Sequence, residues 1–219
     1  MIMGILHKYS NNFMESICIQ NEGLNKLIEN IKPISDFIKN NKIIGLKNQD
    51  AVYSFWWMND MNFERLLSLN LEIAIKGKKN REKEYLNEPR TIYNSNWKID
   101  HAINERLCLY VGKSNYIVDR LNKHLYLSFK KHWYEDAADK FAANMIHKTN
   151  TVCQFRAGIE HLFKKETDFK LEEVLRNHIG ISVYHPDKES KDENMEERFY
   201  LEDLAIGYLR PWFNLDSER

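Results

Sequence analysis

The chain has few cysteines, no excess of charge of either sign and no long apolar segment. Only 3 of its 219 residues are cysteine, and Cys18, Cys108 and Cys153 lie far apart. An odd number without a C-x-x-C pair argues against a disulfide framework and against structural zinc. No segment approaches the ~20 apolar residues of a transmembrane helix, and the N-terminal apolar run is too short for a signal peptide. These absences predict a cytoplasmic protein without a membrane partner.

Its 32 basic residues balance 32 acidic ones, so the net charge offers no argument for nucleic acid or a membrane surface as a partner. The charges are nevertheless segregated along the chain. Segments 76–83 and 113–131 are net basic, whereas segment 187–203 is net acidic. With 43% hydrophobic and 12% aromatic residues, the chain can bury enough apolar surface to fold, which excludes intrinsic disorder.

The apolar pattern predicts an α+β domain with a small sheet flanked by helices. Ser114 or Asn115 is expected to cap a helix that begins near residue 117, and a charged loop is expected at 186–197. The predicted strands are 51–58, 106–111 and 179–184. The predicted helices are 20–40 in two pieces, 62–76, 117–125, 133–147, 154–165, 170–178 and 199–209.

The most informative segment is Leu109-Tyr-Val-Gly-Lys-Ser114, where the second strand runs into a glycine turn. On the helix that follows, Arg120 and His124 stand four residues apart and so share a face. Together with Tyr110 and Lys113 they bring four hydrogen-bond donors to one rim. Such a group suits a phosphate-bearing ligand better than an apolar one.

These motifs resemble the GIY-YIG nuclease superfamily. Its signature is a G-I-Y strand, a Y-I-G strand, a helix with an arginine and a histidine, and a distal glutamate followed by an asparagine. Tyr110-Val-Gly112 corresponds to the second tripeptide, with Arg120 and His124 at the family's offsets. The resemblance covers about 51–214 of the chain. It implies a small antiparallel sheet of the GIY-YIG type and catalytic roles for Tyr110, Arg120 and His124.

The end of the chain resembles the closing helix of that family. Glu202 corresponds to its metal-binding glutamate and Asn214 to its terminal asparagine. Asp203, the next residue after Glu202, points about 100° away on a helix and is a rival ligand that helix spacing alone does not reject. The resemblance selects Glu202. It implies Mg²⁺ at this carboxylate, for which Mn²⁺ can substitute, and a catalytic role for Asn214.

Two segments compete for the first tripeptide. Ala51-Val-Tyr53 lacks the glycine but lies in a well-defined predicted strand, whereas Thr91-Ile-Tyr93 lies nearer to Tyr110. The short hairpin that is usual in the family favours Tyr93. The aromatic continuation of the strand favours Tyr53, which we prefer as the catalytic tyrosine.

The chemistry of phosphodiester hydrolysis suits these residues. It needs a base for the attacking water and cations around the phosphorus, where negative charge builds. A tyrosine has a usual pKa of about 10, so Lys113, Arg120 or a protonated His124 would have to stabilise its phenolate. A single carboxylate, that of Glu202, would hold one hydrated Mg²⁺ rather than a metal pair.

We therefore expect a Mg²⁺-dependent endonuclease of double-stranded DNA, of the type II restriction or phage-defence kind. The expected organisation is an N-terminal helical extension at 1–48 and a nuclease domain at 49–219, with a helical insertion at about 60–100. A homodimer would cut both strands, and successive nicks by a monomer are the alternative. The alternative function is a catalytically inactive nucleic-acid-binding module with the same fold.

Overall fold

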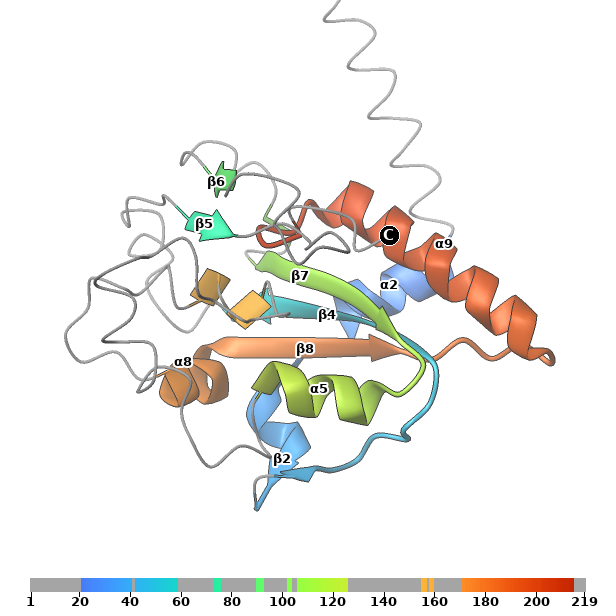
Figure 1. The fold of residues 1–219 in the computed structure, drawn as a ribbon, viewed down its shortest axis with the longest axis horizontal. Helices are drawn as coiled ribbons and strands as arrows, with labels where there is room; N and C mark the ends of the chain where they lie inside the picture. Colours follow the sequence, from blue (N-terminus) through green and yellow to red (C-terminus); the bar gives the residue numbers. More distant parts are fainter. Residues whose placement is uncertain are drawn as a thin grey trace, which may run out of the picture.

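The fold is α+β, with four antiparallel strands in the order β1-β8-β4-β7 (Figure 1). These strands are β1 Lys32–Pro33, β4 Ala51–Trp57, β7 Leu107–Ser114 and β8 Ile179–Tyr184. The computed structural model describes residues 21–40, 42–58, 73–75, 90–92, 102–103, 106–125, 155–156, 158–159 and 171–214.

Strand β4 is the centre of the sheet because every one of its side chains is buried. It lies between β7 and β8, so both of its backbone edges are paired. A run of aromatic and β-branched residues without polar alternation is the pattern expected for a strand that is covered on both faces. Successive side chains of β4 therefore enter two different layers of core.

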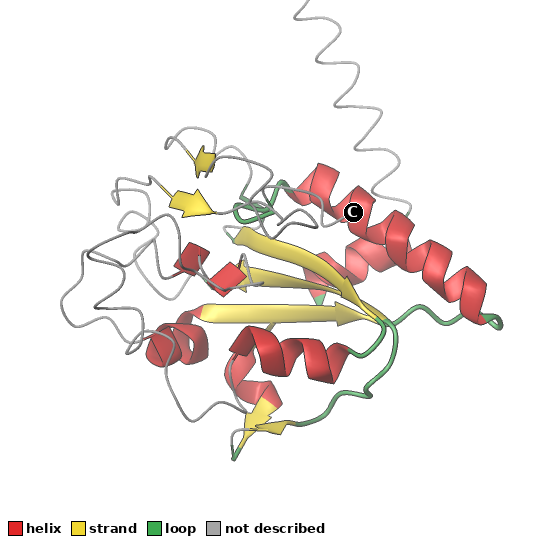
Figure 2. Cartoon of the chain, viewed as in Figure 1, coloured by secondary structure: helices red, strands yellow, loops and turns green. Residues whose placement is uncertain are grey.

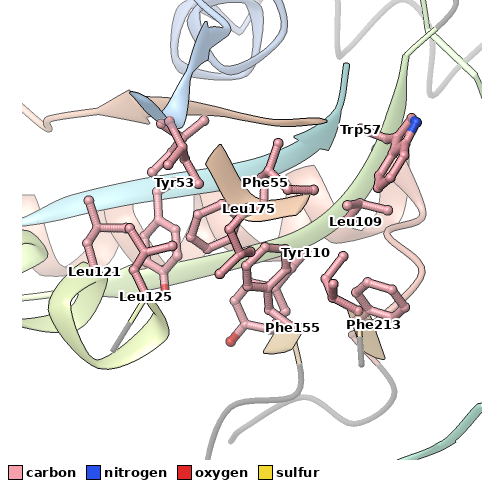
Figure 3. Close-up of a cluster of buried hydrophobic side chains, with 14 of the residues drawn as sticks. Tyr53, Phe55, Trp57, Leu109, Tyr110, Leu121, Leu125, Phe155, Leu175 and Phe213 are labelled. Atoms are coloured by element: carbon pink, nitrogen blue, oxygen red, sulfur yellow. The ribbon is translucent and has the colours of Figure 1, made fainter. Parts of the chain in front are cut away.

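One side of the sheet, which we call the tyrosine face, carries Tyr53, Phe55 and Tyr110. Helices α5 (Ile117–Leu125) and α8 (Leu171–His178) and the 3-10 turn η1 (Ile34–Phe37) cover it (Figure 2). Figure 3 shows the aromatic rings of Tyr53, Phe55, Tyr110 and Phe155 gathered in this layer. The Phe55 and Phe155 rings are stacked, with 4.0 Å between their centroids.

The other side, which we call the α9 face, carries Val52, Trp56 and Val111. Helices α2 (Glu22–Glu29) and α9 (Lys191–Leu209) pack against it through apolar residues that recur at helical spacing. Among the described residues, no helix is both long and apolar enough to cross a membrane.

Two small sheets lie outside the central one. Strands β2 (Ile38–Lys39) and β3 (Lys42–Ile43) form a tight hairpin, in which Asn40 takes the positive φ of 52° that the turn requires. Strands β5 (Ile73–Ile75) and β6 (Arg90–Ile92) form the second pair.

Most of the predicted elements that fall on described residues are confirmed. The strands at 51–58, 106–111 and 179–184 correspond to β4, β7 and β8, and the helices at 117–125 and 170–178 correspond to α5 and α8. Residues 155–156 and 158–159 are helical, within the helix predicted at 154–165. The helix predicted at 133–147 lies outside the described residues.

Three predicted elements are wrong in part. The second helical piece, at 34–38, is a single 3-10 turn followed by β2, because the spacing of Ile34, Phe37 and Ile38 fits one short turn as well as a helix. Residues 73–75, assigned to a helical insertion, form β5 and pair with β6. That long-range pairing overrides a local apolar pattern that is ambiguous in so short a segment.

The charged loop predicted at 186–197 is also wrong, because α9 begins at Lys191. Ser190 accepts a hydrogen bond from the Glu193 N–H, and the Glu193 side chain bonds back to the Ser190 N–H. This reciprocal pair is a capping box. Lysine and glutamate are good helix formers, so charge density alone did not distinguish a loop from a solvated helical turn.

The N-terminal segment is joined to the central sheet. Strand β1 pairs with β8 through Lys32 and Pro33, and α2 packs on the α9 face through Leu24 and Leu27. Ser182 of β8 also donates a hydrogen bond to the Leu27 carbonyl at 2.5 Å.

Candidate functional site

The pairing of β4 with β7 places Tyr53 directly opposite Gly112. A Cβ atom at residue 112 would lie 2.6 Å from the Tyr53 hydroxyl and 2.8 Å from a ring carbon of Tyr110. Real Cβ atoms do not approach other atoms so closely, and the obstructing groups belong to buried aromatic rings. The glycine of the Tyr110-Val-Gly112 motif is therefore required because the Tyr53 side chain lies across it.

Three side chains predicted as site residues meet on the tyrosine face. The Tyr53 hydroxyl lies 2.6 Å from Nε2 of His124 and accepts a hydrogen bond from Nε of Arg120 at 3.2 Å. Strand β4 supplies the tyrosine, and one turn of α5 supplies the other two, since residues four apart share a helix face. The four-residue spacing from Arg120 to His124 thus brings both side chains to the Tyr53 hydroxyl.

Burial holds His124 in its neutral form. Its exposed fraction is 1%, and its pKa lies well below the usual value of 6.5 because of burial and the nearby positive charges of Arg120 and Arg156. A neutral imidazole can accept a hydrogen bond from the Tyr53 hydroxyl at Nε2. The protonated His124 considered above as a cation is therefore contradicted, which leaves Arg120 as the cation bonded to the Tyr53 oxygen.

The lowered pKa of His124 also predicts a pH dependence of stability. Below about pH 6.5 the unfolded chain binds a proton at His124 that the folded chain does not, so the free energy of unfolding is expected to fall as the pH drops below this value.

Aromatic rings close the site toward the interior. The Tyr110 ring lies 5.4 Å from the His124 ring, and the Phe155 ring lies 6.2 Å from it. Tyr53 itself is 0% exposed and Tyr110 2%. Arg120, which is half-buried, is the member of the Tyr53–His124–Arg120 cluster that a ligand meets first.

The predicted site residues Lys113 and Glu202 lie on the other face of the sheet. Because side chains alternate along a strand, Lys113 points away from the Gly112 side, and its ammonium forms an ion pair with the Glu202 carboxylate of α9. The two side chains are only 17% and 14% exposed. The ammonium also lies 4.2 Å from the centroid of the Phe199 ring. Lys113 therefore does not join Arg120 at the Tyr53 oxygen.

The carboxylate of Glu202 offers oxygen ligands of the kind that Mg²⁺ binds. One carboxylate is enough for such a site, because Mg²⁺ keeps several waters and takes further oxygens from a substrate phosphate. Among the described residues there is no group of three or more His, Cys, Asp or Glu side chains arranged around a metal position. A metal at Glu202 would share the carboxylate with Lys113 or displace its ammonium.

Asn214 acts as a clamp on the backbone of β7. Its side-chain oxygen accepts the Val111 N–H at 2.8 Å, and its side-chain amide donates to the Val111 carbonyl at 2.7 Å. The N–H groups of Trp212 and Phe213 donate to the carbonyls of Cys108 and Leu109. The segment after α9 thus covers the outer edge of β7 in the way a further strand would. This geometry makes Asn214 a positioning residue for the strand that carries Gly112.

Replacing Asn214 with alanine should lower the free energy of unfolding by about 1–3 kcal/mol, since two buried backbone groups of Val111 lose their partner. Urea denaturation measures the change. Asn194→Ala is the matched control, because the Asn194 amide makes the same two-point bond to the backbone of Lys188 at an exposed site. Water can replace that bond, so a smaller loss is expected. Equal losses in the two variants would contradict the assignment.

Sequence reasoning missed two polar contacts around the site. Asn48, rather than Ser114 or Asn115, bonds the start of α5: its side-chain oxygen accepts the N–H groups of Val118 and Asp119, 70 or more residues away. Ser114 accepts the N–H of Tyr116 instead. No local pattern identifies a cap supplied from so far along the chain.

The second missed contact involves Arg198 of α9, which is 4% exposed. It donates to Asp50 at 2.8 Å and also bonds the side-chain oxygen of Asn115. These bonds tie the start of β4 and the end of β7 to α9. Arg156 donates to the Lys123 carbonyl near the end of α5 at 3.0 Å.

Strand pairing bears on the choice between Tyr53 and Tyr93 as the catalytic tyrosine of the first strand. Strand β4, which carries Tyr53, is the neighbour of β7 in the central sheet. Strand β6, which ends at Ile92, pairs with β5 in a separate sheet, and Tyr93 lies outside the described residues.

Comparisons with protein-family models, with curated proteins and with solved structures find no significant match to this chain.

Proposed function

We propose that the protein is a Mg²⁺-dependent DNA endonuclease of the GIY-YIG type, acting on double-stranded DNA in a restriction or phage-defence system. The observation that carries the proposal is the buried cluster in which the Tyr53 hydroxyl bonds both a neutral His124 and Arg120. The Arg120 cation at the Tyr53 oxygen favours the ionised form of the hydroxyl, and the hydrogen bond with the neutral imidazole fixes the direction of that hydroxyl. An ordinary core tyrosine needs only one hydrogen-bond partner.

In this proposal the three side chains divide the proton transfer and the charge stabilisation between them. Nε2 of the neutral His124 hydrogen-bonds the Tyr53 hydroxyl and orients it. The Arg120 N–H stabilises the phenolate that remains once the hydroxyl proton has passed to solvent. The phenolate then accepts a proton from the water that attacks phosphorus. The guanidinium of Arg120 also binds a non-bridging phosphate oxygen, where negative charge develops in the transition state.

Glu202 would hold the Mg²⁺ ion. Its partner Lys113 directly follows Gly112, which lies opposite Tyr53, so the carboxylate and the Tyr53–His124–Arg120 cluster lie at the same end of β7 although on different faces. When bound there, the ion would supply positive charge at the leaving oxygen of a phosphate at this strand end. The proposal assigns Asn214 to positioning of β7, and Tyr110 to packing against the imidazole of His124. Lys113 is the ion-pair partner of the same carboxylate. The half-buried position of this pair strengthens its electrostatic interaction relative to an exposed pair.

The second candidate function is a catalytically inactive nucleic-acid-binding module. Two observations favour it: Tyr53 is fully buried, and Lys113 engages the Glu202 carboxylate. A productive enzyme must let water reach the Tyr53 oxygen when Arg120 turns toward a phosphate. An inactive module would bind DNA without that rearrangement.

Cleavage of supercoiled plasmid separates the two functions. With Mg²⁺ in excess over the protein, wild-type protein is expected to produce nicked and linear DNA. Excess EDTA should stop the reaction, because the single-carboxylate site binds metal reversibly. A gel-shift assay with the same DNA in EDTA measures binding separately. If neither Mg²⁺ nor Mn²⁺ supports cutting while DNA is bound, the protein is the inactive module. If DNA is neither cut nor bound, both proposals are wrong.

A further inference from the structure

The β2–β3 hairpin and the loop after it carry charge of one sign only. Lys39, Lys42 and Lys47 are all exposed. No aspartate or glutamate occurs from residue 37 to residue 49. In a chain whose net charge is zero, this segment, which we call the lysine hairpin, is a local concentration of positive charge. The acids that flank it in the sequence are Asp36 and Asp50, and Asp50 forms an ion pair with Arg198.

The lysine hairpin is fixed to the helix that carries Arg120 and His124. The Asn48 side chain bonds the Val118 N–H at 2.9 Å, and the Gln49 carbonyl accepts the Ile117 N–H at 3.3 Å. Strand β3 packs beside α5, as Figure 1 also shows. The position of the lysines relative to the Tyr53–His124–Arg120 cluster is therefore set by hydrogen bonds as well as by packing.

The apolar side chains of the hairpin face the core on the same side as the cluster. Phe37, Ile38, Ile43 and Leu46 pack against the layer that contains Tyr53 and Leu121. With these side chains turned inward, the exposed lysines lie on the outer surface of the tyrosine face. The hairpin thus adds positive charge to the side of the sheet from which Arg120 is reached.

The opposite side of the sheet carries the opposite charge. Helix α9 packs on the α9 face, and the exposed positions of its outer surface include several acids and few bases: Asp192, Glu193, Glu196 and Asp203. The exposed acids of α9 repel a polyanion and the lysine hairpin attracts it, so DNA is favoured to approach from the hairpin side. Glu202 is not one of these exposed acids, because its side chain is 14% exposed and paired with Lys113. Flexible exposed lysines are suited to phosphate contacts that do not depend on base sequence.

We propose that Lys39, Lys42 and Lys47 bind backbone phosphates of DNA next to the scissile phosphate and so hold the duplex on the tyrosine face. This inference rests on the proposed nuclease function and names the surface that positions its substrate. The lysines contact phosphates only, so they raise affinity for all sequences equally.

The test is the salt dependence of DNA binding by the full chain with Lys39, Lys42 and Lys47 all changed to glutamine. The probe is a fluorescein-labelled 30-base-pair duplex in EDTA, which prevents cutting. If each lysine neutralises one phosphate, the slope of log K against log salt should become less steep by about 2.7. The affinity deficit of the variant should then be about 40-fold larger at 50 mM than at 200 mM salt.

The matched control changes three exposed lysines on or next to α2 and α9, Lys26, Lys188 and Lys191, to glutamine. The change in net charge is the same, so an effect of total charge alone would appear in both triple variants.

An unchanged slope in the hairpin variant, with wild-type protein still cutting plasmid, would overturn the inference and leave the nuclease proposal standing. Wild-type protein that neither cuts nor binds DNA would defeat the nuclease proposal itself. Loss of binding to phosphatidylserine vesicles with unchanged DNA binding would assign the hairpin to a membrane surface and also overturn the inference.

Discussion

Replacing Tyr53 with phenylalanine is expected to lower the rate of plasmid cleavage by about 10²–10⁴-fold, the range typical of a lost general base. The substitution removes only the hydroxyl. The ring that packs against Phe55, with 5.7 Å between the centroids, remains in place. Nε2 of His124 and Nε of Arg120 then lose the oxygen that joins them. Cleavage rates under single-turnover conditions measure the effect on chemistry without that of product release.

Tyr184→Phe is the matched control for this substitution. Tyr184 is also a buried tyrosine in the central sheet, and its hydroxyl donates to Glu197 at 2.7 Å, on the α9 face. The Tyr184 hydroxyl bond is only partly buried, whereas the Tyr53–His124 bond is buried, so Tyr184→Phe is expected to lose no more stability than Tyr53→Phe, about 1–3 kcal/mol. Only Tyr53→Phe should lose activity. Equal activities in the two variants would show that Tyr53 is a core residue and no more.

The pH profile of the wild-type enzyme gives an independent readout of the same cluster. Because burial and nearby cations hold the pKa of His124 well below 6.5, the imidazole stays neutral as the pH falls through that value. The cleavage rate is therefore expected to rise with pH as more of the Tyr53 phenolate forms, without an inflection near pH 6.5 from His124. A loss of activity centred near pH 6.5 would contradict the assigned role of His124.

Replacing Glu202 with glutamine is expected to lower Mg²⁺-dependent cleavage by about 10³-fold or more. A catalytic metal supplies several kcal/mol of transition-state stabilisation, and about 1.4 kcal/mol corresponds to a factor of ten in rate. Glutamine keeps the size of the side chain and removes the charge that binds metal. The loss should be partly recovered by raising the Mg²⁺ or Mn²⁺ concentration, which a metal titration of the cleavage rate will show.

Two variants separate metal binding from the ion pair that Glu202 makes with Lys113. Asp203→Asn removes a neighbouring, exposed carboxylate of the same helix and is expected to leave cleavage unchanged. The double variant Lys113→Met with Glu202→Gln removes both partners of the pair. If the unpaired ammonium caused the loss in Glu202→Gln, the double variant would regain activity; if Glu202 binds the metal, activity stays low.

The sequence alone predicted those parts of the fold that depend on local patterns. The uninterrupted apolar run of β4, the strand that ends at Gly112 and the amphipathic α5 are each defined by neighbouring residues. The four-residue spacing from Arg120 to His124 also predicted that these two side chains share a face. The start of α9 was missed although its capping box was visible in the sequence, because the density of charge was interpreted as a loop.

Only the tertiary structure decided which candidate residues act together. The register of β4 on β7 brings Tyr53 across Gly112 to α5, and the pleat sends Lys113 to the opposite face and to Glu202. The hydrogen bonds of Asn214 with Val111 join residues 103 positions apart. Such contacts arise from long-range strand register and helix packing, where a shift of one residue would exchange the two faces of the sheet. The sequence named one set of candidate site residues, and the fold divided it into the Tyr53–His124–Arg120 cluster, the Lys113–Glu202 pair and the Asn214 clamp.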